Sequence, residues 1–80
     1  MQTYEALRQA ARLGGLSLNK VSRALGKPES YISSAISRGS VPRCDTMARM
    51  ADVCGYSLAL LPRDKVPPDA LVIDPPPREG

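Results

Sequence analysis

The hydrophobic residues of this 80-residue chain follow a helical spacing up to residue 55 and an alternating spacing after it. Apolar side chains recur three or four positions apart, and each such run is followed by glycine, which is typical of short amphipathic helices. The pattern predicts four helices, at residues 3–13, 17–25, 28–38 and 44–54, with Thr3 and Ser17 capping the first two. Because helices this short are marginal alone, we expect them to share one core.

The segment after Gly55 has a different pattern. Tyr56, Leu58 and Leu60 alternate with less apolar positions, and a period of two favours a β-strand. A second short apolar run occupies residues 70–73, beyond a proline-containing loop. The sequence therefore predicts a short C-terminal β-hairpin or β arm, which pairs either within the chain or with a second copy. The proline-rich residues 75–80 are predicted to be a disordered tail.

Residues 16–37 place two helical patterns on either side of a Gly-Lys-Pro break. A steep crossing through so short a turn needs a residue that accepts a left-handed backbone, and Gly26 does. It also needs a small residue where the first helix faces the second, and Ser22 is small. Apolar contacts between the two helices come from Val21, Leu25, Ile32 and Ala35. These spacings match a helix-turn-helix, in which the second helix lies in the major groove of DNA.

Charge is distributed unevenly along the chain. The net charge is +3; residues 1–62 hold eight Lys and Arg against four acidic residues, and residues 63–80 hold three against four. The helical part is thus the basic part, which is compatible with a phosphate-bearing partner.

Several functional classes have no support in the composition. The chain has no His, and no nucleophile–base pair, metal-ligand set or small-molecule site is visible, so we expect no enzyme, metal or cofactor. Cys44 and Cys54 lie ten residues apart on one predicted helix, about 15 Å, which is too far for a disulfide. We expect two buried free thiols. With no signal peptide and no long apolar run, we expect a cytoplasmic protein without a membrane contact.

The chain resembles the Xre/Cro-type helix-turn-helix of phage repressors from Leu7 to Leu61. The residues that carry the resemblance are Gly15-Leu16-Ser17, Leu25-Gly26, Ile32-Ser33, Pro42, Thr46-Met47, Met50-Ala51 and Gly55-Tyr56-Ser57-Leu58. The resemblance implies a mainly α fold, a compact four-helix helix-turn-helix domain like that of the lambda repressor. The chain departs from the family at Leu18, where a polar residue is usual, and at Pro28, where Ser or Thr often caps the next helix.

The resemblance also implies which residues meet DNA. Base edges would be contacted by exposed residues at the start of the third helix, namely Glu29, Ser30, Tyr31, Ser33 and Ser34. Because no Arg or Gln is among them, we expect these side chains to discriminate only modestly between bases. Specificity would then depend on half-site spacing, dimerisation and DNA shape. Phosphates would be bound by flanking cations and neutral donors, namely Asn19, Lys20, Arg23, Lys27, Arg38, Ser40 and Arg43.

Two functions follow from these observations. The first is a sequence-specific DNA-binding transcriptional regulator, a phage or mobile-element repressor that binds double-stranded DNA as a homodimer on a palindromic operator. Residues 1–55 would then bind DNA, and the β segment at residues 56–74 would hold the dimer together. The alternative is a protein-interaction module, such as an antitoxin or an adaptor without DNA binding. The weak set of base-contacting residues and the uncapped Pro28 support that alternative more than the sequence of a typical family member would.

Overall fold

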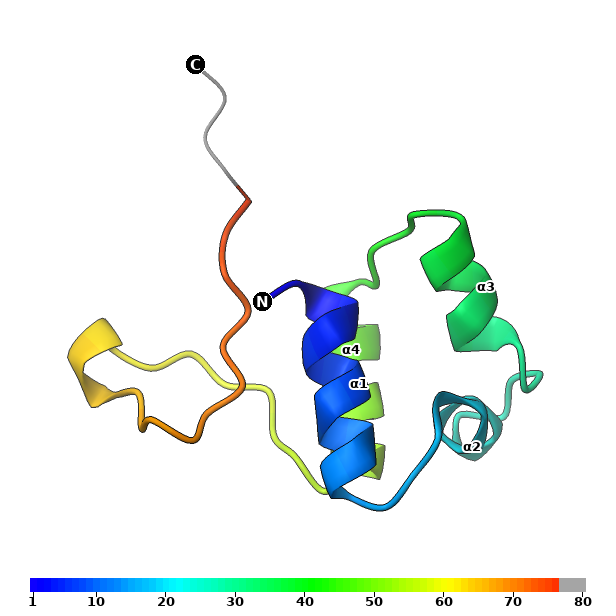
Figure 1. The fold of residues 1–80 in the computed structure, drawn as a ribbon, viewed down its shortest axis with the longest axis horizontal. Helices are drawn as coiled ribbons and strands as arrows, with labels where there is room; N and C mark the ends of the chain where they lie inside the picture. The colour runs from blue at the N-terminus through cyan, green and yellow to red at the C-terminus, as the bar shows by residue number, and fades with distance from the viewer. Residues whose placement is uncertain (77–80) are drawn as a thin grey trace.

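The computed structural model describes residues 1–76 of the chain. It contains four α-helices, α1 (Thr3–Leu13), α2 (Leu18–Ala24), α3 (Tyr31–Ser37) and α4 (Cys44–Val53), and one 3-10 turn, η1 (Arg63–Lys65). In Figure 1, α1 and α4 occupy the middle of the molecule, α2 and α3 form one end, and residues 57–74 extend at the other. The four predicted helices are therefore present, and the fold is mainly α.

A single apolar core joins the four helices. Leu7, Val21, Ile32 and Met50, one from each helix, are at most 1% exposed. Smaller side chains from α1 and the sulfur of Cys54 fill the space between them. Each helix alone is too short to be stable in water, so this shared core is what holds them.

Each helix is followed, two residues after its last residue, by a glycine with a left-handed backbone. At the end of α2, Gly26 has φ +75°, and the Lys27 N–H donates to the Ser22 carbonyl at 3.1 Å. This closure satisfies one of the carbonyls that a helix end leaves free. The other three helices close in the same way. In each, the residue after Gly15, Gly39 or Gly55 donates its N–H to the carbonyl five residues earlier. The predicted role of Gly26 at the turn is thus confirmed.

Two helix starts differ from the sequence prediction. Gln2, not Thr3, is the N-cap of α1, and its backbone N–H donates to the Glu5 carboxylate at 3.4 Å. The third helix begins at Tyr31 and not at Pro28, because the Tyr31 N–H donates to the Pro28 carbonyl at 3.0 Å and closes a turn before the helix. Glu29 and Ser30 therefore precede α3 and do not belong to its first turn.

The prediction of a C-terminal β-hairpin is wrong. Residues 1–76 contain no strand, and residues 57–61 make no backbone hydrogen bond to any other described segment. The connection that should have formed a hairpin loop instead forms two separate turns, closed by Lys65 N–H to Pro62 and Ala70 N–H to Pro67. With four prolines between residues 62 and 75, the chain lacks several N–H donors that a ladder requires.

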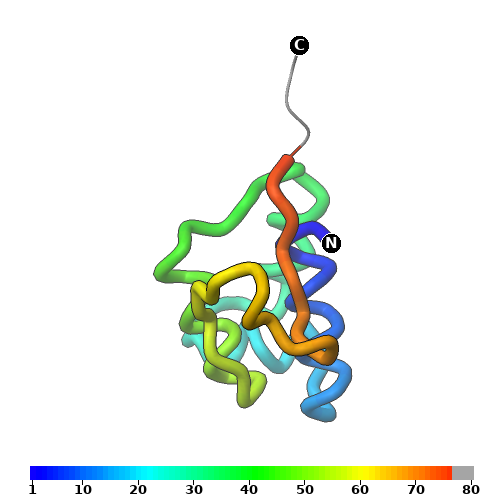
Figure 2. Tube along the Cα trace, turned by 90° about the vertical axis from the view of Figure 1, so that its left-hand side faces the viewer, coloured from blue at the N-terminus to red at the C-terminus, as the bar shows by residue number. Residues whose placement is uncertain are grey.

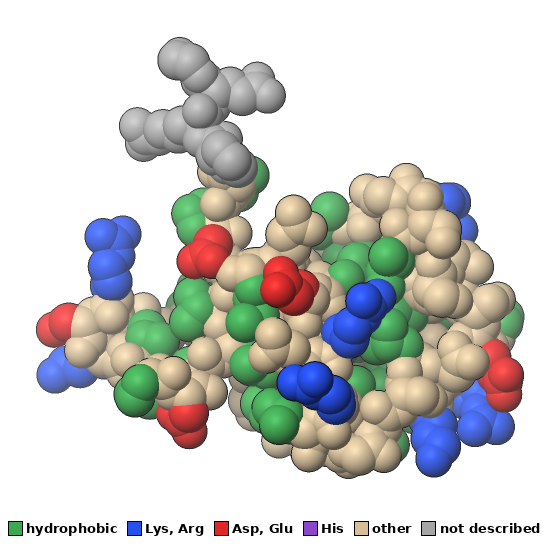
Figure 3. Space-filling view, viewed as in Figure 1, with side chains coloured by type: hydrophobic (Ala, Val, Ile, Leu, Met, Phe, Trp, Pro, Cys, Tyr) green, Lys and Arg blue, Asp and Glu red, His purple; other side chains and the backbone are tan. Residues whose placement is uncertain are grey.

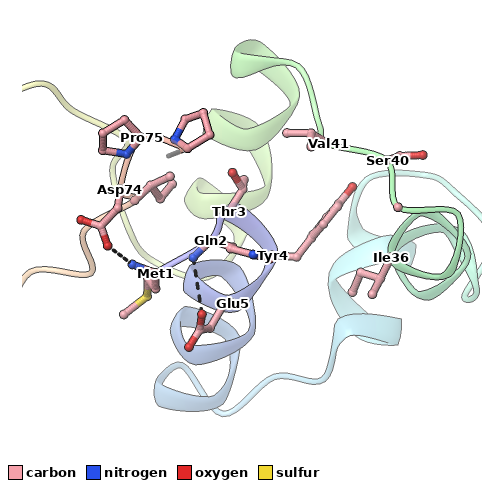
Figure 4. A pocket seen from close by; sticks show the side chains of 13 residues that line it. Met1, Gln2, Thr3, Tyr4, Glu5, Ile36, Ser40, Val41, Asp74 and Pro75 are labelled. Carbon is pink, nitrogen blue, oxygen red and sulfur yellow. Dashed lines mark hydrogen bonds and ion pairs between the residues drawn. The ribbon is translucent and has the colours of Figure 1, made fainter. Parts of the chain in front are cut away.

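The second apolar run pairs with the start of the chain. The Met1 amine donates to the Val72 carbonyl at 3.1 Å, and the Asp74 N–H donates to the Met1 carbonyl at 3.0 Å. The Met1 amine also forms an ion pair with the Asp74 carboxylate (Figure 4). Residues 70–76 consequently run beside the start of α1 (Figure 2). Of the predicted disordered tail, residues 77–80 lie outside the described residues.

The cysteines differ from each other in exposure. Cys54 is buried in the core, and burial raises the pKa of its thiol. Cys44, at the start of α4, is exposed, so the prediction of two buried thiols is wrong for this residue. Within the described part of the chain, no helix is long and apolar enough to span a membrane.

The hydroxyl of Ser22 links α2 to α3. It donates to the Leu18 carbonyl at 2.9 Å and accepts from the Ile32 backbone N–H at 3.3 Å, and the side chain is 0% exposed. The N-cap of α3, Ser30, makes no side-chain bond to the helix. Ser22 therefore supplies, from the neighbouring helix, a cap that the start of α3 lacks.

We predict that Ser22→Ala lowers the free energy of unfolding by about 1–3 kcal/mol relative to its control, because the buried Ile32 N–H is left without a partner. The matched control is Ser37→Ala, an exposed serine on α3 that gains the same helix propensity from the substitution. Urea denaturation followed by circular dichroism measures both. Equal midpoints for the two variants would show that the Ser22 bonds do not stabilise the domain.

Candidate nucleic-acid interface

The exposed face of α3 consists of serine side chains. Ile32 and Ala35 point into the core, and this orientation leaves Ser33 and Ser37 exposed one helical turn apart. Ser30 is exposed just before the helix, whereas Ser34 is half-buried at the side of this face. Ser37 was not among the predicted base-contacting residues. Its position four residues after Ser33 is the signal that would have identified it.

Glu29 is already engaged by a cation of the same site. Its carboxylate lies 3.4 Å from the Arg23 guanidinium, and both side chains are more than half exposed. The pair joins the end of α2 to the segment before α3. Two residues that were expected to contact DNA separately, one at bases and one at phosphates, thus neutralise each other in the free protein.

Tyr31 lies at the edge of the core. It is half-buried and packs against the core residues, and the Lys27 ammonium lies over its ring, 5.5 Å from the centroid. Tyr4 of α1 points toward the loop that joins α3 to α4 (Figure 4). Burial raises the pKa of the Tyr4 phenol, the nearby Tyr31 raises it further, and the Arg38 guanidinium lowers it. Because Tyr31 packs against the core and lies under the Lys27 ammonium, it helps to position the start of α3.

The predicted phosphate-binding residues surround the serine face. Exposed cations lie on α2, in the turn, after α3 and before α4, and Figure 3 shows basic side chains around the end formed by α2 and α3. These cations are Lys20, Arg23, Lys27, Arg38 and Arg43. Asn19 is exposed and Ser40 half-buried. Arg43 is 3.5 Å from Asp45, but its side chain is 85% exposed and can turn toward another anion.

Other chemistry has little support at this surface. Among residues 1–76, no three His, Cys, Asp or Glu side chains gather in a way that could hold a metal ion. The site therefore offers hydroxyl donors and acceptors on a helix, bordered by positive charge. That combination suits the edge and backbone of a nucleic-acid duplex.

The arrangement of α2, the turn at Gly26 and α3 defines a helix-turn-helix protein. The family model HTH_3, helix-turn-helix, matches residues 7–61. The chain belongs to this Xre/Cro-like family, whose members are DNA-binding regulators and generally not enzymes. Comparison with curated proteins and with solved structures gives no match.

We predict that Glu29→Gln strengthens binding to DNA and steepens the fall of log affinity with log salt by up to about one unit, because it releases Arg23 for a phosphate. Stability should change by less than about 0.5 kcal/mol, since the pair is exposed. Fluorescence anisotropy at several salt concentrations measures both effects on binding. The control is Asp52→Asn, which removes an exposed carboxylate from α4. An equal gain in the control would mean that only net charge matters.

Proposed function

We propose that the protein is a sequence-specific transcriptional regulator, a repressor of phage or mobile-element type that acts in the cytoplasm by occupying its operator. The observation that carries this proposal is the serine face of α3, which is exposed on a helix that Ser22 caps and is bordered by cations on α2, in the turn, after α3 and before α4. A face of this kind fits the major groove, while the cations reach the phosphates on either side.

In this proposal, Ser30, Ser33 and Ser37 lie nearest the base edges, with Glu29 and Ser34 at the sides of the face. Serine can bond to several bases and therefore discriminates weakly. Lys20, Lys27, Arg38 and Arg43 bind phosphates and fix the register of α3 in the groove. Arg23 joins them when DNA competes with Glu29. Asn19 and Ser40 add neutral donors at the same phosphates.

A single copy with this set of side chains would bind one half-site weakly. We therefore propose that two copies bind a palindromic operator, where the second half-site multiplies the affinity of the first. The centres of the half-sites would lie about 34 Å apart, or one turn of DNA. The bound dimer excludes polymerase from the promoter, and sequence-dependent shape between the half-sites adds discrimination.

Selection of bound sequences from random double-stranded DNA with the purified full chain tests the proposal. We expect an enriched palindrome whose half-sites are separated by about one helical turn. A library from which no sequence is enriched, at low salt and at high protein concentration, would contradict it. That outcome would favour the protein-interaction module. The absence of Arg and Gln from α3 is consistent with this alternative.

Two substitutions separate the proposed phosphate contacts from the base contacts. We predict that Arg43→Ala weakens binding to all sequences alike and makes the salt dependence shallower by about one unit. Ser37→Ala should leave the salt dependence unchanged and alter the base preference at one position per half-site. Anisotropy titrations and repeated selection measure these effects. Identical selected sequences for wild type and Ser37→Ala would remove Ser37 from the proposed contacts.

A further inference from the structure

Tyr4, near the start of α1, lies beside the loop that joins α3 to α4. It lines an open hollow together with Ile36 of α3 and with Gly39 and Ser40 of the loop. Figure 4 shows its ring extending from α1 toward Ser40. The phenol of a helix outside the helix-turn-helix therefore reaches the loop on which the proposed phosphate-binding residues Arg38 and Ser40 lie.

The Tyr4 hydroxyl has no partner within the described part of the chain. None of the side-chain hydrogen bonds among residues 1–76 involves it, and no buried side-chain oxygen in that range lacks a partner. The hydroxyl is therefore open to solvent, although the side chain as a whole is half-buried. A phenol that keeps its proton at neutral pH is a hydrogen-bond donor, so this hydroxyl is free to donate.

A cation without an acidic partner lies near the same hydroxyl. Arg38 is the C-cap of α3, directly before the Gly39 and Ser40 that line the hollow with Tyr4. Burial and the nearby Tyr31 raise the pKa of the Tyr4 phenol, and the Arg38 guanidinium is close enough to lower it. The exposed Arg38 side chain forms no ion pair among residues 1–76. A free positive charge from α3 and a free donor from α1 thus face one position.

The carboxylates that also line this hollow are engaged elsewhere. Glu5 accepts a backbone N–H at the start of α1 at 3.4 Å, and Asp74 forms an ion pair with the Met1 amine. Figure 4 shows both carboxylates on the side of the hollow away from Ser40. An anion placed between Tyr4 and Ser40 would therefore meet hydroxyl donors and the Arg38 charge.

We propose that Tyr4, Arg38 and Ser40 together bind one phosphate of the DNA backbone. The inference rests on the proposed function, in which Arg38 and Ser40 bind phosphates, and it adds α1 to the DNA-binding surface. Phosphate contacts fix the orientation of a recognition helix on the duplex. A contact from α1 beside the end of α3 thus holds the far end of the serine face in the groove, as Lys20 and Lys27 hold its start.

The test compares Tyr4→Phe with Tyr56→Phe by fluorescence anisotropy, on the selected operator and on a random duplex. Tyr4→Phe removes the hydroxyl and keeps the ring. Tyr56 is also half-buried against the core, but it follows α4 and does not line the hollow. We expect Tyr4→Phe to weaken binding to both duplexes by about threefold to tenfold, with an unchanged slope of log affinity against log salt, because a neutral donor is lost. Tyr56→Phe should bind like wild type.

A second measurement locates the phosphate. Methylphosphonate substitution neutralises the phosphates of the operator one at a time. At the shared phosphate, we expect this substitution to weaken the wild type and to weaken Tyr4→Phe and Arg38→Ala clearly less, because each variant has already lost part of the contact. If Tyr4 acted only through packing, Tyr4→Phe would leave the effect of every single phosphate as it is in the wild type.

The outcomes distinguish this inference from the proposed function. A palindrome that Tyr4→Phe binds as tightly as wild type, or a loss that is coupled to no single phosphate, overturns the contact and leaves the function standing. A wild type that enriches no sequence but binds a random duplex at low salt, more tightly than Tyr4→Phe, upholds the contact and contradicts sequence-specific regulation. A wild type that binds no duplex overturns both.

Discussion

The hydrogen bond from the Ile32 backbone to the Ser22 hydroxyl is the contact on which the candidate site depends most. The third helix has seven residues, and a helix of that length does not form without outside support. The side chain of its N-cap residue, Ser30, makes no hydrogen bond to the helix. Pro28 occupies a position where the family often has a capping Ser or Thr. A buried hydroxyl on α2 replaces the missing cap. Since the same hydroxyl is also bonded to α2, it fixes the start of one helix against the other.

This link explains why the turn tolerates a sequence that departs from the family. Residues 25–30 carry a proline, a cation and an acid, and two exposed contacts brace them, the Arg23–Glu29 pair and the Lys27 ammonium over the Tyr31 ring. Each such contact is worth little in water. The buried Ser22 bonds and the Ile32 side chain do most of the positioning, so the exposed charges can exchange partners when a phosphate approaches.

The sequence predicted well those features that depend on neighbours along the chain. Helix spacing and a glycine at each helix end are local signals, and both led to the four helices. The bounds of α1 followed from them without error. The start of α3 did not, because the turn closed by Pro28 and Tyr31 competes with an earlier helix start. The match over residues 7–61 confirmed the family that the ordered spacing of small and apolar residues had indicated.

Features that depend on distant parts of the chain were not accessible from the pattern. The alternation in residues 56–61 indicates an extended backbone but does not identify the segment that pairs with it. The second apolar run, at residues 70–73, pairs with Met1 instead. Likewise, the exposure of Cys44 depends on where the C-terminal segment passes, and the engagement of Glu29 depends on the end of α2. None of these has a periodic signature.

The thinness of the core bears directly on the candidate site. A domain of this size buries only about 60% of the surface that its unfolded chain exposes, and here one core of small and medium side chains must support the α3 face at one end and the C-terminal segment at the other. The α3 end is stabilised by the bond from Ser22 of α2, whereas the C-terminal segment is held at Met1 by the bonds of Val72 and Asp74. A face of serines on one such helix discriminates weakly between bases, so the proposed function requires a second copy to supply a second serine face.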